Sequence, residues 1–160
     1  MIRATTVNDI HAIAKLAIAA KMFSESDEAF LHTMMEEYFS TNQALGHGCL
    51  IDEENGEPRG VAYYTPVKAT DRVWELLMIA VHPDLQGRGR GAALMSQVES
   101  TLREQGQRMI IVQTSGQPSY ALTRLFYTKL GYEQEARVRD YYAAGEDMIL
   151  FRKLLEAVHE

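Results

Sequence analysis

The sequence predicts a mixed α/β (α+β) fold in which four helices flank a central, mostly antiparallel, twisted sheet of about seven strands. Three observations lead to this fold class. Apolar residues recur at helical spacing near the start of the chain, the pattern changes to that of strands from residue 48, and helices alternate with strands after residue 81. Such an order is typical of a sheet covered by helices, with one crossover between its middle strands.

The first part of the chain contains one strand and two helices. Residues 2–5 are a strand candidate, and residues 6–9 resemble a capping box, with an acidic residue three positions after the cap. Apolar residues at helical spacing then predict a helix over residues 10–20. Residues 24–27 interrupt this pattern and can cap a second helix, whose apolar positions span residues 30–38.

Three strands follow. Residues 48–52 and 59–67 flank Asn55-Gly56, and Asn-Gly between apolar runs is a strong hairpin signal. Residues 73–81 are almost continuously apolar, which predicts a central strand covered on both faces. The only cysteine, Cys49, lies in the first of these strands and is expected to be a small core residue and not a nucleophile.

The second half of the chain alternates helices with strands. An apolar stripe predicts a helix over residues 92–102, a strand follows at 108–114, and a helix over 118–130 ends at Gly131 as its cap. A turn at residues 144–146 joins the last two strands. These strands are expected near residues 134–142 and 148–153.

Size and composition fit an ordinary globular protein. The chain has 160 residues, of which 46% are hydrophobic and 24% charged. One domain, residues 1–160, is expected, because domains commonly have roughly 100–200 residues. Lys and Arg total 16 against 22 Asp and Glu, giving a formal charge of −6. This balance argues against a nucleic-acid partner and is compatible with a cationic substrate, although an acidic surface also simply maintains solubility.

Cysteine content and hydropathy predict the compartment. A single thiol forms no internal disulfide, which favours a reducing, cytoplasmic location. The N-terminal residues lack the apolar core of a signal peptide, and no segment approaches the roughly 18 apolar residues of a membrane span. No membrane partner is therefore expected.

The segment Gln86-Gly87-Arg88-Gly89-Arg90-Gly91 has glycine at every second position between a buried strand and a helix. Glycine lets the backbone approach a ligand closely and adopt positive φ. A helix start also presents unpaired N–H groups with partial positive charge, and a pyrophosphate commonly binds there. Arg88 and Arg90 add positive charge that can meet phosphates or remain solvated.

Two nucleotide-binding interpretations of this turn fail. The string Gly-x-x-x-x-Gly-Lys-Ser/Thr of a nucleotide P-loop is absent. Gly87, Gly89 and Ala92 nominally satisfy a dinucleotide fingerprint. That fingerprint requires an acidic ribose ligand about 20 residues later, and residues 111–113 there contain no carboxylate.

A third interpretation comes from a family resemblance. Gln86-x-x-Gly89-x-Gly91, after the turn at residues 82–85, resembles the coenzyme A signature of the GNAT superfamily of N-acetyltransferases. Residues 125–132, Leu-Phe-Tyr-Thr-Lys-Leu-Gly-Tyr, are similar to a second segment of that family. The predicted order of elements also matches the family along the whole chain, so a GNAT-like fold is expected.

The resemblance implies that acetyl-CoA is the cosubstrate and that the central strand splays away from its neighbour. Backbone groups of residues 78–81 would line the pantetheine arm, and the amides of residues 87–92 would hold the pyrophosphate. Many members carry Asn where this chain has Tyr120, so Ser119 or a backbone group is expected to replace that contact. The implied cofactor-binding residues are Met78, Ile79, Ala80, Val81, Gln86, Gly87, Arg88, Gly89, Arg90, Gly91, Ala92, Ser119 and Tyr120.

Acetyl transfer to an amine needs a base that removes the amine proton. Glu75 is the candidate, because it is the lone charge in an apolar strand and burial raises the pKa of a carboxyl group. Family members that use a glutamate base carry it at a matching place. The alternative is that Glu75 faces solvent or pairs with an arginine.

The leaving thiolate needs a proton, and the resemblance makes Tyr127 the candidate acid. Phe126 and Tyr127 point about 100° apart on a helix, so one can pack inward while the other reaches the splayed strands. The alternative for Tyr127 is a core aromatic residue. A backbone amide near Ile79 or Val81 is expected to stabilise the oxyanion.

No metal site is expected, because the histidines lie far apart in the chain without the spacing of ligands. They are His11, His32, His47, His82 and His159.

These patterns predict an enzyme that moves the acetyl group of acetyl-CoA to a primary amine of a small molecule. One alternative is acetylation of a peptide amine at a protein N-terminus, and another is a module that binds acetyl-CoA without catalysis. Whether the chain forms a homodimer is left open. Carboxylates expected to attract a cationic acceptor are Glu25, Asp27, Glu28, Asp140, Glu146 and Asp147.

Overall fold

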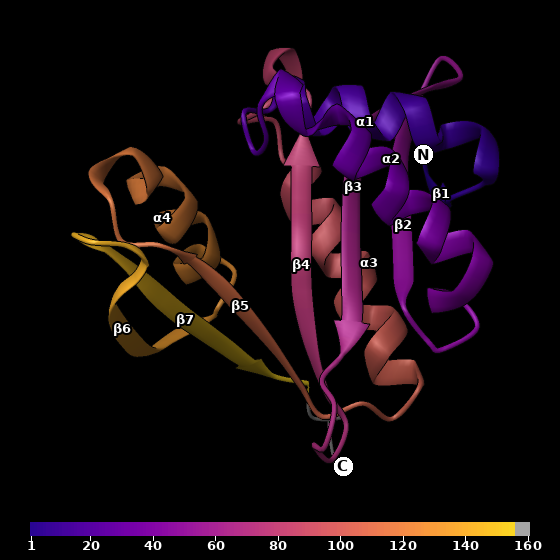
Figure 1. Ribbon diagram of the computed structural model, residues 1–160. Coiled ribbons are helices and arrows are strands. Elements are labelled where there is room, and N and C mark those ends of the chain that lie inside the picture. Colours follow the sequence, from indigo (N-terminus) through magenta and orange to yellow (C-terminus); the bar gives the residue numbers. More distant parts are fainter. Residues whose placement is uncertain (156–160) are drawn as a thin grey trace.

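Seven strands form one sheet in the order β1-β2-β3-β4-β5-β7-β6 within residues 1–155, the part of the chain that the computed structural model describes (Figure 1). The strands are β1 (Ile2–Ala4), β2 (Gly48–Glu54), β3 (Glu57–Pro66), β4 (Val73–Val81), β5 (Met109–Ser115), β6 (Glu133–Ala143) and β7 (Glu146–Leu154). The α-helices of this part are α1 (Ile10–Ala19), α2 (Glu28–Glu37), α3 (Arg90–Glu104) and α4 (Ala121–Lys129). The predicted fold class and order of elements are confirmed.

The sheet divides into two arms between β4 and β5. These strands form its parallel pair, and they pair only from Val73 opposite Met109 to Leu76 opposite Val112. Beyond that point β4 continues beside β3 as far as Val81, while β5 continues beside β7. Figure 1 shows the two arms diverging, with β4 on one side and β5, β7 and β6 on the other. A split therefore opens in the middle of the sheet.

A bulge in β4 lies at the start of the split. Tyr63 of β3 is opposite Met78 and Tyr64 is opposite Leu76, so Leu77 has no partner on β3. The side chain of Leu77 is 52% exposed. A bulge of this kind bends the strand and changes the direction of the side chains that follow it.

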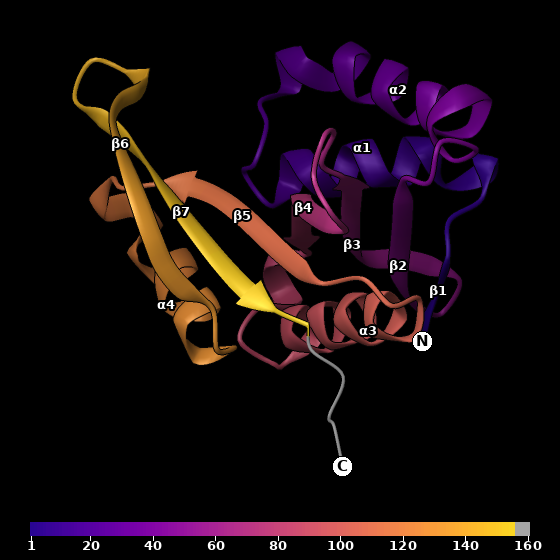
Figure 2. The ribbon, with the colours of Figure 1, turned by 90° about the horizontal axis from the view of Figure 1, so that it is seen from below.

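Helices cover both faces of the first arm, as Figure 2 shows, with α1 and α2 on one face and α3 on the other. The bulge decides which core each side chain of β4 joins. Before it, Trp74 and Leu76 pack in the core under α3. After it, Met78 and Ala80 pack in the core under α1 and α2. The even-numbered side chains of β4 therefore point to the α3 face before Leu77 and to the face of α1 and α2 after it.

The apolar stripes identified in the sequence form these cores. In α3, Leu94, Met95, Val98 and Leu102 are fully buried. In α1 and α2 the buried residues recur at helical spacing, as expected for helices with one face on a sheet. They are Ile13, Ala14, Leu16, Ala17, Leu31 and Met35.

Two further expectations can be compared with the structure. Cys49 is buried in β2, and burial raises the pKa of its thiol to about 12, so it stays protonated at neutral pH. The strand predicted at residues 134–142 forms, but its pairing with β7 is interrupted between Val138 and Ala143. Asp140, with φ of +56°, lies in this interruption.

None of the helices within residues 1–155 is long and apolar enough to cross a membrane.

Candidate active site

The candidate site is the split between β4 and β5. Backbone N–H and C=O groups of β4 after Leu76 that point away from β3 have no strand partner on that side. The carbonyl oxygen of Val81 has a partner within the protein, because it accepts a hydrogen bond from the side-chain amide of Gln86 at 3.0 Å. The side chain of Gln86 therefore holds the glycine-rich turn against the end of β4.

Two glycines of the turn have the backbone conformation that the sequence suggests. Gly87 has φ of +76° and Gly89 has φ of +82°, a region that L residues with side chains rarely adopt. A Cβ atom on either would meet nothing within 4 Å, so the outer side of the turn is open. Gly89 is the residue before the first turn of α3, and the leading N–H groups of a helix have no partner within that helix.

Gly91 is required for a different reason. It lies inside α3, and a Cβ atom there would come within 3.2 Å of the ring of Phe126 and 3.7 Å of Val81. This glycine therefore allows the start of α3 to approach α4 and the end of β4 closely. The three elements that border the split meet at this point.

The two arginines of the turn have different surroundings. Arg90 donates to Asp52 at 3.1 Å and is also paired with Glu54, both on β2. Part of its guanidinium is therefore already engaged inside the protein, and a contact between Arg90 and a phosphate stays a prediction. Arg88 is exposed and forms no ion pair within residues 1–155.

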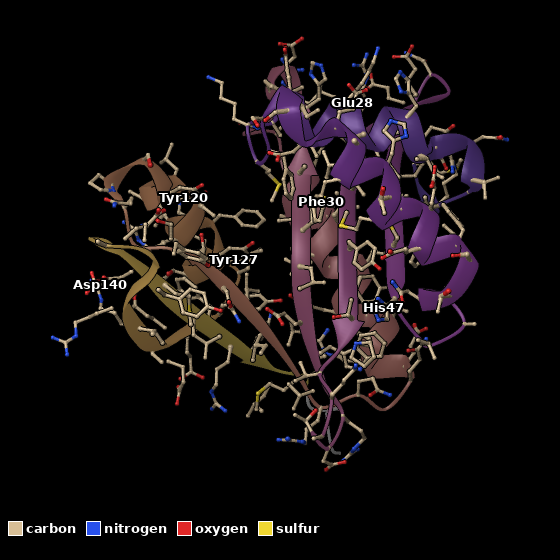
Figure 3. All side chains as sticks on the ribbon, viewed as in Figure 1. Glu28, Phe30, His47, Tyr120, Tyr127 and Asp140 are labelled. Atoms are coloured by element: carbon tan, nitrogen blue, oxygen red, sulfur yellow. The ribbon has the colours of Figure 1, made fainter. Side chains whose placement is uncertain are left out.

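Two tyrosines lie across the split from β4: Tyr127 in α4 and Tyr120 just before this helix. Figure 3 shows Tyr120 and Tyr127 on this side and Phe30 of α2 on the opposite side. Tyr120 is 40% exposed and ends the short turn Pro118–Tyr120 that precedes α4. Arg124 fixes this turn, because its guanidinium donates to the carbonyl oxygens of Ser115 at 2.8 Å and Gln117 at 2.9 Å.

Glu75 lies on β4, one residue before the last pair with β5, opposite Thr65 and Ile111. Burial raises the pKa of its carboxyl group, and no other cause contributes. No ion pair to Glu75 forms among the described residues, so the predicted alternative of an arginine partner is not found there. A half-buried carboxylate without a partner thus stands where the strands part.

Tyr127 is buried, with only 4% of its surface exposed. Its ring packs against Phe126, Tyr132 and Phe151 at centroid distances of 5.2, 5.8 and 5.6 Å. Burial raises the pKa of its phenol well above the ordinary value, so the hydroxyl keeps its proton at neutral pH. The structure therefore places the ring in the core, and the role of the hydroxyl as a proton donor stays a prediction.

Sequence analysis missed one residue of this region, Tyr142. Its pKa is raised by burial first, and then by the negative charges of Tyr141, Glu146, Tyr120 and Glu75. It therefore lies within electrostatic reach of Glu75 on one arm and Tyr120 on the other. Sequence patterns do not reveal this proximity, because Tyr142 lies on β6 and Glu75 on β4, two strands far apart in the chain.

A family model described as the acetyltransferase (GNAT) family matches residues 10–132, well over half of the chain. The chain belongs to the GNAT acetyltransferase family. It is accordingly an acetyl-CoA-dependent N-acetyltransferase, as the resemblance implied. Curated protein sequences gave no match.

Solved structures of GNAT proteins share the fold. A protein from Desulfovibrio desulfuricans assigned to this family is 29% identical, with a TM-score of 0.92, 98% of this chain and 99% of that chain covered. The ribosomal-protein-S18-alanine N-acetyltransferase of Escherichia coli is 23% identical, with a TM-score of 0.79 and coverages of 100% and 96%. An aminoglycoside 6′-N-acetyltransferase complexed with coenzyme A is 15% identical, with a TM-score of 0.78 and coverages of 100% and 99%.

The geometry of the split fits the cosubstrate that GNAT enzymes use. Acetyl-CoA combines a doubly charged pyrophosphate with an extended arm that carries amide groups. The open, positive-φ glycines before α3 can receive the phosphates, and the unpaired edge of β4 can receive the arm.

Carboxylates that the sequence places near the acceptor are mostly held within the protein. Asp147 pairs with Arg137 at 2.6 Å and accepts from the backbone of Asp140 at 3.0 Å. Glu146 accepts from the hydroxyl of Ser115 at 2.8 Å, and Asp27 accepts from Ser24 at 2.9 Å. Among the described residues, only Asp147 of these three carboxylates is paired with a cation, so Glu146 and Asp27 keep their charge, and the attraction of a cationic acceptor stays a prediction.

One cavity of about 360 Å³ lies outside the split, between α1 and the start of β3. Neither Glu75 nor Tyr127 borders it. The residues that line it are His11, Ala12, Lys15, Leu16, Ala19, Glu57, Pro58, Arg59 and His82.

Proposed function

We propose that this GNAT acetyltransferase transfers the acetyl group of acetyl-CoA to a primary amine of a small molecule. The observation that carries the proposal is the unpaired, half-buried carboxylate of Glu75 at the point where β4 leaves β5. A module that only binds acetyl-CoA gains nothing from this carboxylate, whose burial opposes its charged form.

The coenzyme would be held chiefly by backbone groups. The amides of residues 87–92 would hold the pyrophosphate at the start of α3, and the exposed Arg88 would add a charge. The edge of β4 at residues 78–81 would hold the pantetheine arm, with Gln86 fixing the turn and Ser119 or Tyr120 contacting the arm from α4. When bound, acetyl-CoA supplies an activated acetyl thioester.

Glu75 and Tyr127 would move the protons. An ammonium group becomes nucleophilic only after losing a proton, and a carboxylate with a raised pKa is a suitable acceptor near neutral pH. Tyr127, which stays protonated, would donate its proton to the departing sulfur. A backbone amide near Ile79 or Val81 would stabilise the negative charge that develops on the acetyl oxygen.

Support for a small acceptor comes from the surroundings of Glu75. Tyr142 of β6 lies within electrostatic range of both Glu75 and Tyr120, so an aromatic side chain of the other arm stands near the carboxylate. The alternative acceptor is the N-terminal amine of a protein. The similar folds act on both kinds of substrate, since one is named for ribosomal protein S18 and another for aminoglycosides.

We further propose that residues 1–160 act as one N-acetyltransferase domain in the cytoplasm, in keeping with the buried free thiol of Cys49. The test is a screen for free thiol released from acetyl-CoA in the presence of primary amines or of peptides with free N-termini. We expect turnover with small amines. Turnover with peptides alone would replace the small acceptor by a protein N-terminus, and binding without any turnover would favour the sensor module.

A further inference from the structure

Three metal-ligating side chains meet on the outer surface of the α1–α2 pair, away from the split. Nδ1 of His11 and Nε2 of His32 each lie 3.9 Å from Oε1 of Glu28. Considering one donor atom for each residue, all three lie within 4.8 Å of one another. No metal site was expected because the histidines are far apart in the sequence, but α1 and α2 bring together His11 and His32, which are 21 positions apart (32 − 11).

The arrangement follows from the helices. Glu28 and His32 are four residues apart on α2, so their side chains lie on the same face, one turn from each other. His11 faces them from the first turn of α1, and the two histidine rings are 5.6 Å apart at their centroids. Both helices are fixed from below by fully buried residues, among them Ile13 and Leu31. The donors therefore stand on elements that packing already holds together.

These distances suit a tetrahedral transition-metal ion. Two donors bound to one Zn²⁺ at 2.0–2.2 Å are about 3.3–3.6 Å apart, by tetrahedral geometry. The two pairs at 3.9 Å would have to close by about 0.5 Å and the two histidine nitrogens, within 4.8 Å of each other, by up to about 1.4 Å, which rotation of exposed side chains allows. The side chains are 61% exposed for His11, 47% for Glu28 and 31% for His32, so an ion can reach them from solvent.

We propose that His11, Glu28 and His32 bind one Zn²⁺ ion that links α1 to α2. Two imidazole nitrogens and one carboxylate oxygen form a ligand set that zinc commonly takes, with water in the fourth position. The ion would stabilise the helix pair. It would take no part in acetyl transfer, and the proposal stands independently of the proposed acceptor.

The test is a calorimetric titration of ZnCl₂ into untagged, chelator-treated protein, followed by thermal unfolding with and without zinc. We expect one Zn²⁺ per chain and a higher melting temperature with zinc. His11→Gln, His32→Gln and Glu28→Gln should each lower the affinity at least about tenfold, since even an outer-shell partner costs 10–100-fold. Circular dichroism of each variant establishes that it is folded.

His82→Gln is the matched control. Nδ1 of His82 lies 3.7 Å from Oδ2 of Asp84, a similar histidine–carboxylate pair that has no third ligand within the described residues. This variant should bind zinc as the wild type does. Absence of zinc binding by the wild type, or an unchanged affinity in either His11→Gln or His32→Gln, would overturn the proposal and leave only ion pairs at this surface.

Discussion

Glu75 lowers the stability of the folded protein when its carboxyl group is charged, although the charged form is the one that the proposed base requires. Its carboxyl pKa is raised because folding half-buries the group. The folded protein therefore holds this proton more tightly than the unfolded chain, and stability falls as the pH rises through the folded pKa. The proposed use of Glu75 as a base would account for a carboxylate in this position, since a neutral isostere would avoid the loss.

Replacing Glu75 by Gln should consequently lower turnover and raise the melting temperature at neutral pH. Loss of a general base costs about 10²–10⁴-fold in rate. The defect should shrink at high pH, where more of the amine is already neutral. The measurement is a pH–rate profile of both proteins with thermal unfolding at pH 7. A variant profile that overlays the wild type would exclude Glu75 as the base.

Tyr127 offers a cleaner separation of chemistry from packing. Tyr127→Phe retains the ring that packs against Phe151 and Tyr132 and removes only the hydroxyl. Turnover should fall by about 10²–10⁴-fold, while acetyl-CoA affinity and melting temperature stay close to those of the wild type. Rapid-quench measurements with saturating substrates report the chemical step. An unchanged rate for that step would assign Tyr127 to the core alone.

At the scale of elements, the start of α3 has two arginines with separate tasks. Arg90 anchors the helix to β2 through Asp52, a side chain that is 9% exposed. Arg90→Ala should reduce the free energy of unfolding by about 1–3 kcal/mol, because it removes one of the two cations within residues 1–155 that pair with the buried Asp52 carboxylate, the other being the N-terminal ammonium group. Arg88→Ala is the matched control, and its effect on unfolding should stay within about 0.5 kcal/mol.

The affinity for acetyl-CoA should depend on Arg88 more than on Arg90, the reverse of the order expected for stability. Arg88→Ala should weaken binding, and more so at low salt, because an exposed cation near a phosphate is screened by ions. Arg90→Ala, measured well below its melting temperature, should retain most of the affinity. Urea denaturation and calorimetry give the two quantities. If Arg88→Ala and Arg90→Ala had equal effects on the free energy of unfolding and on the acetyl-CoA affinity, the proposed separate roles of the two arginines would be contradicted.

Local sequence patterns predicted the elements well, because each pattern reports burial of one face. The stripe that contains Leu94 and Val98 predicted α3, and Asn55-Gly56 predicted the β2–β3 turn. The bulge at Leu77 and the interrupted pairing around Asp140 were not predictable in this way. Both depend on which residue of a neighbouring strand lies opposite, and the sequence of one strand does not contain that information.

The sequence predicted only part of the candidate site, because it shows local motifs but not contacts between distant segments. The glycine-rich turn is a local motif, so its residues could be named from the sequence. Tyr142 and the group formed by His11, Glu28 and His32 depend on contacts between distant segments. The ion pairs of Arg90 with Asp52 and of Asp147 with Arg137 also join different elements, so the local motifs that drew attention to Arg90 and Asp147 did not predict them.

For the whole molecule, the central feature is a sheet that parts in its middle. Strands β4 and β5 share four residue pairs and then diverge, because β5 is held by β7 and β4 by β3. Glu75, the proposed base, lies one residue before the last pair, and the proposed phosphate-binding turn precedes the helix that follows β4. Separation of the two strands would thus provide both a binding edge and a place for chemistry.

Backbone hydrogen exchange with and without acetyl-CoA tests directly whether this split is the coenzyme site. Amides of β4 after Leu76 and of residues 87–92 are expected to exchange more slowly when acetyl-CoA is bound, because the ligand accepts their hydrogen bonds or covers them. Amides of α1 and α2 should change little. Slower exchange confined to α1 and α2, or no change at β4 and the glycine-rich turn at saturating acetyl-CoA, would contradict the placement of the coenzyme in the split.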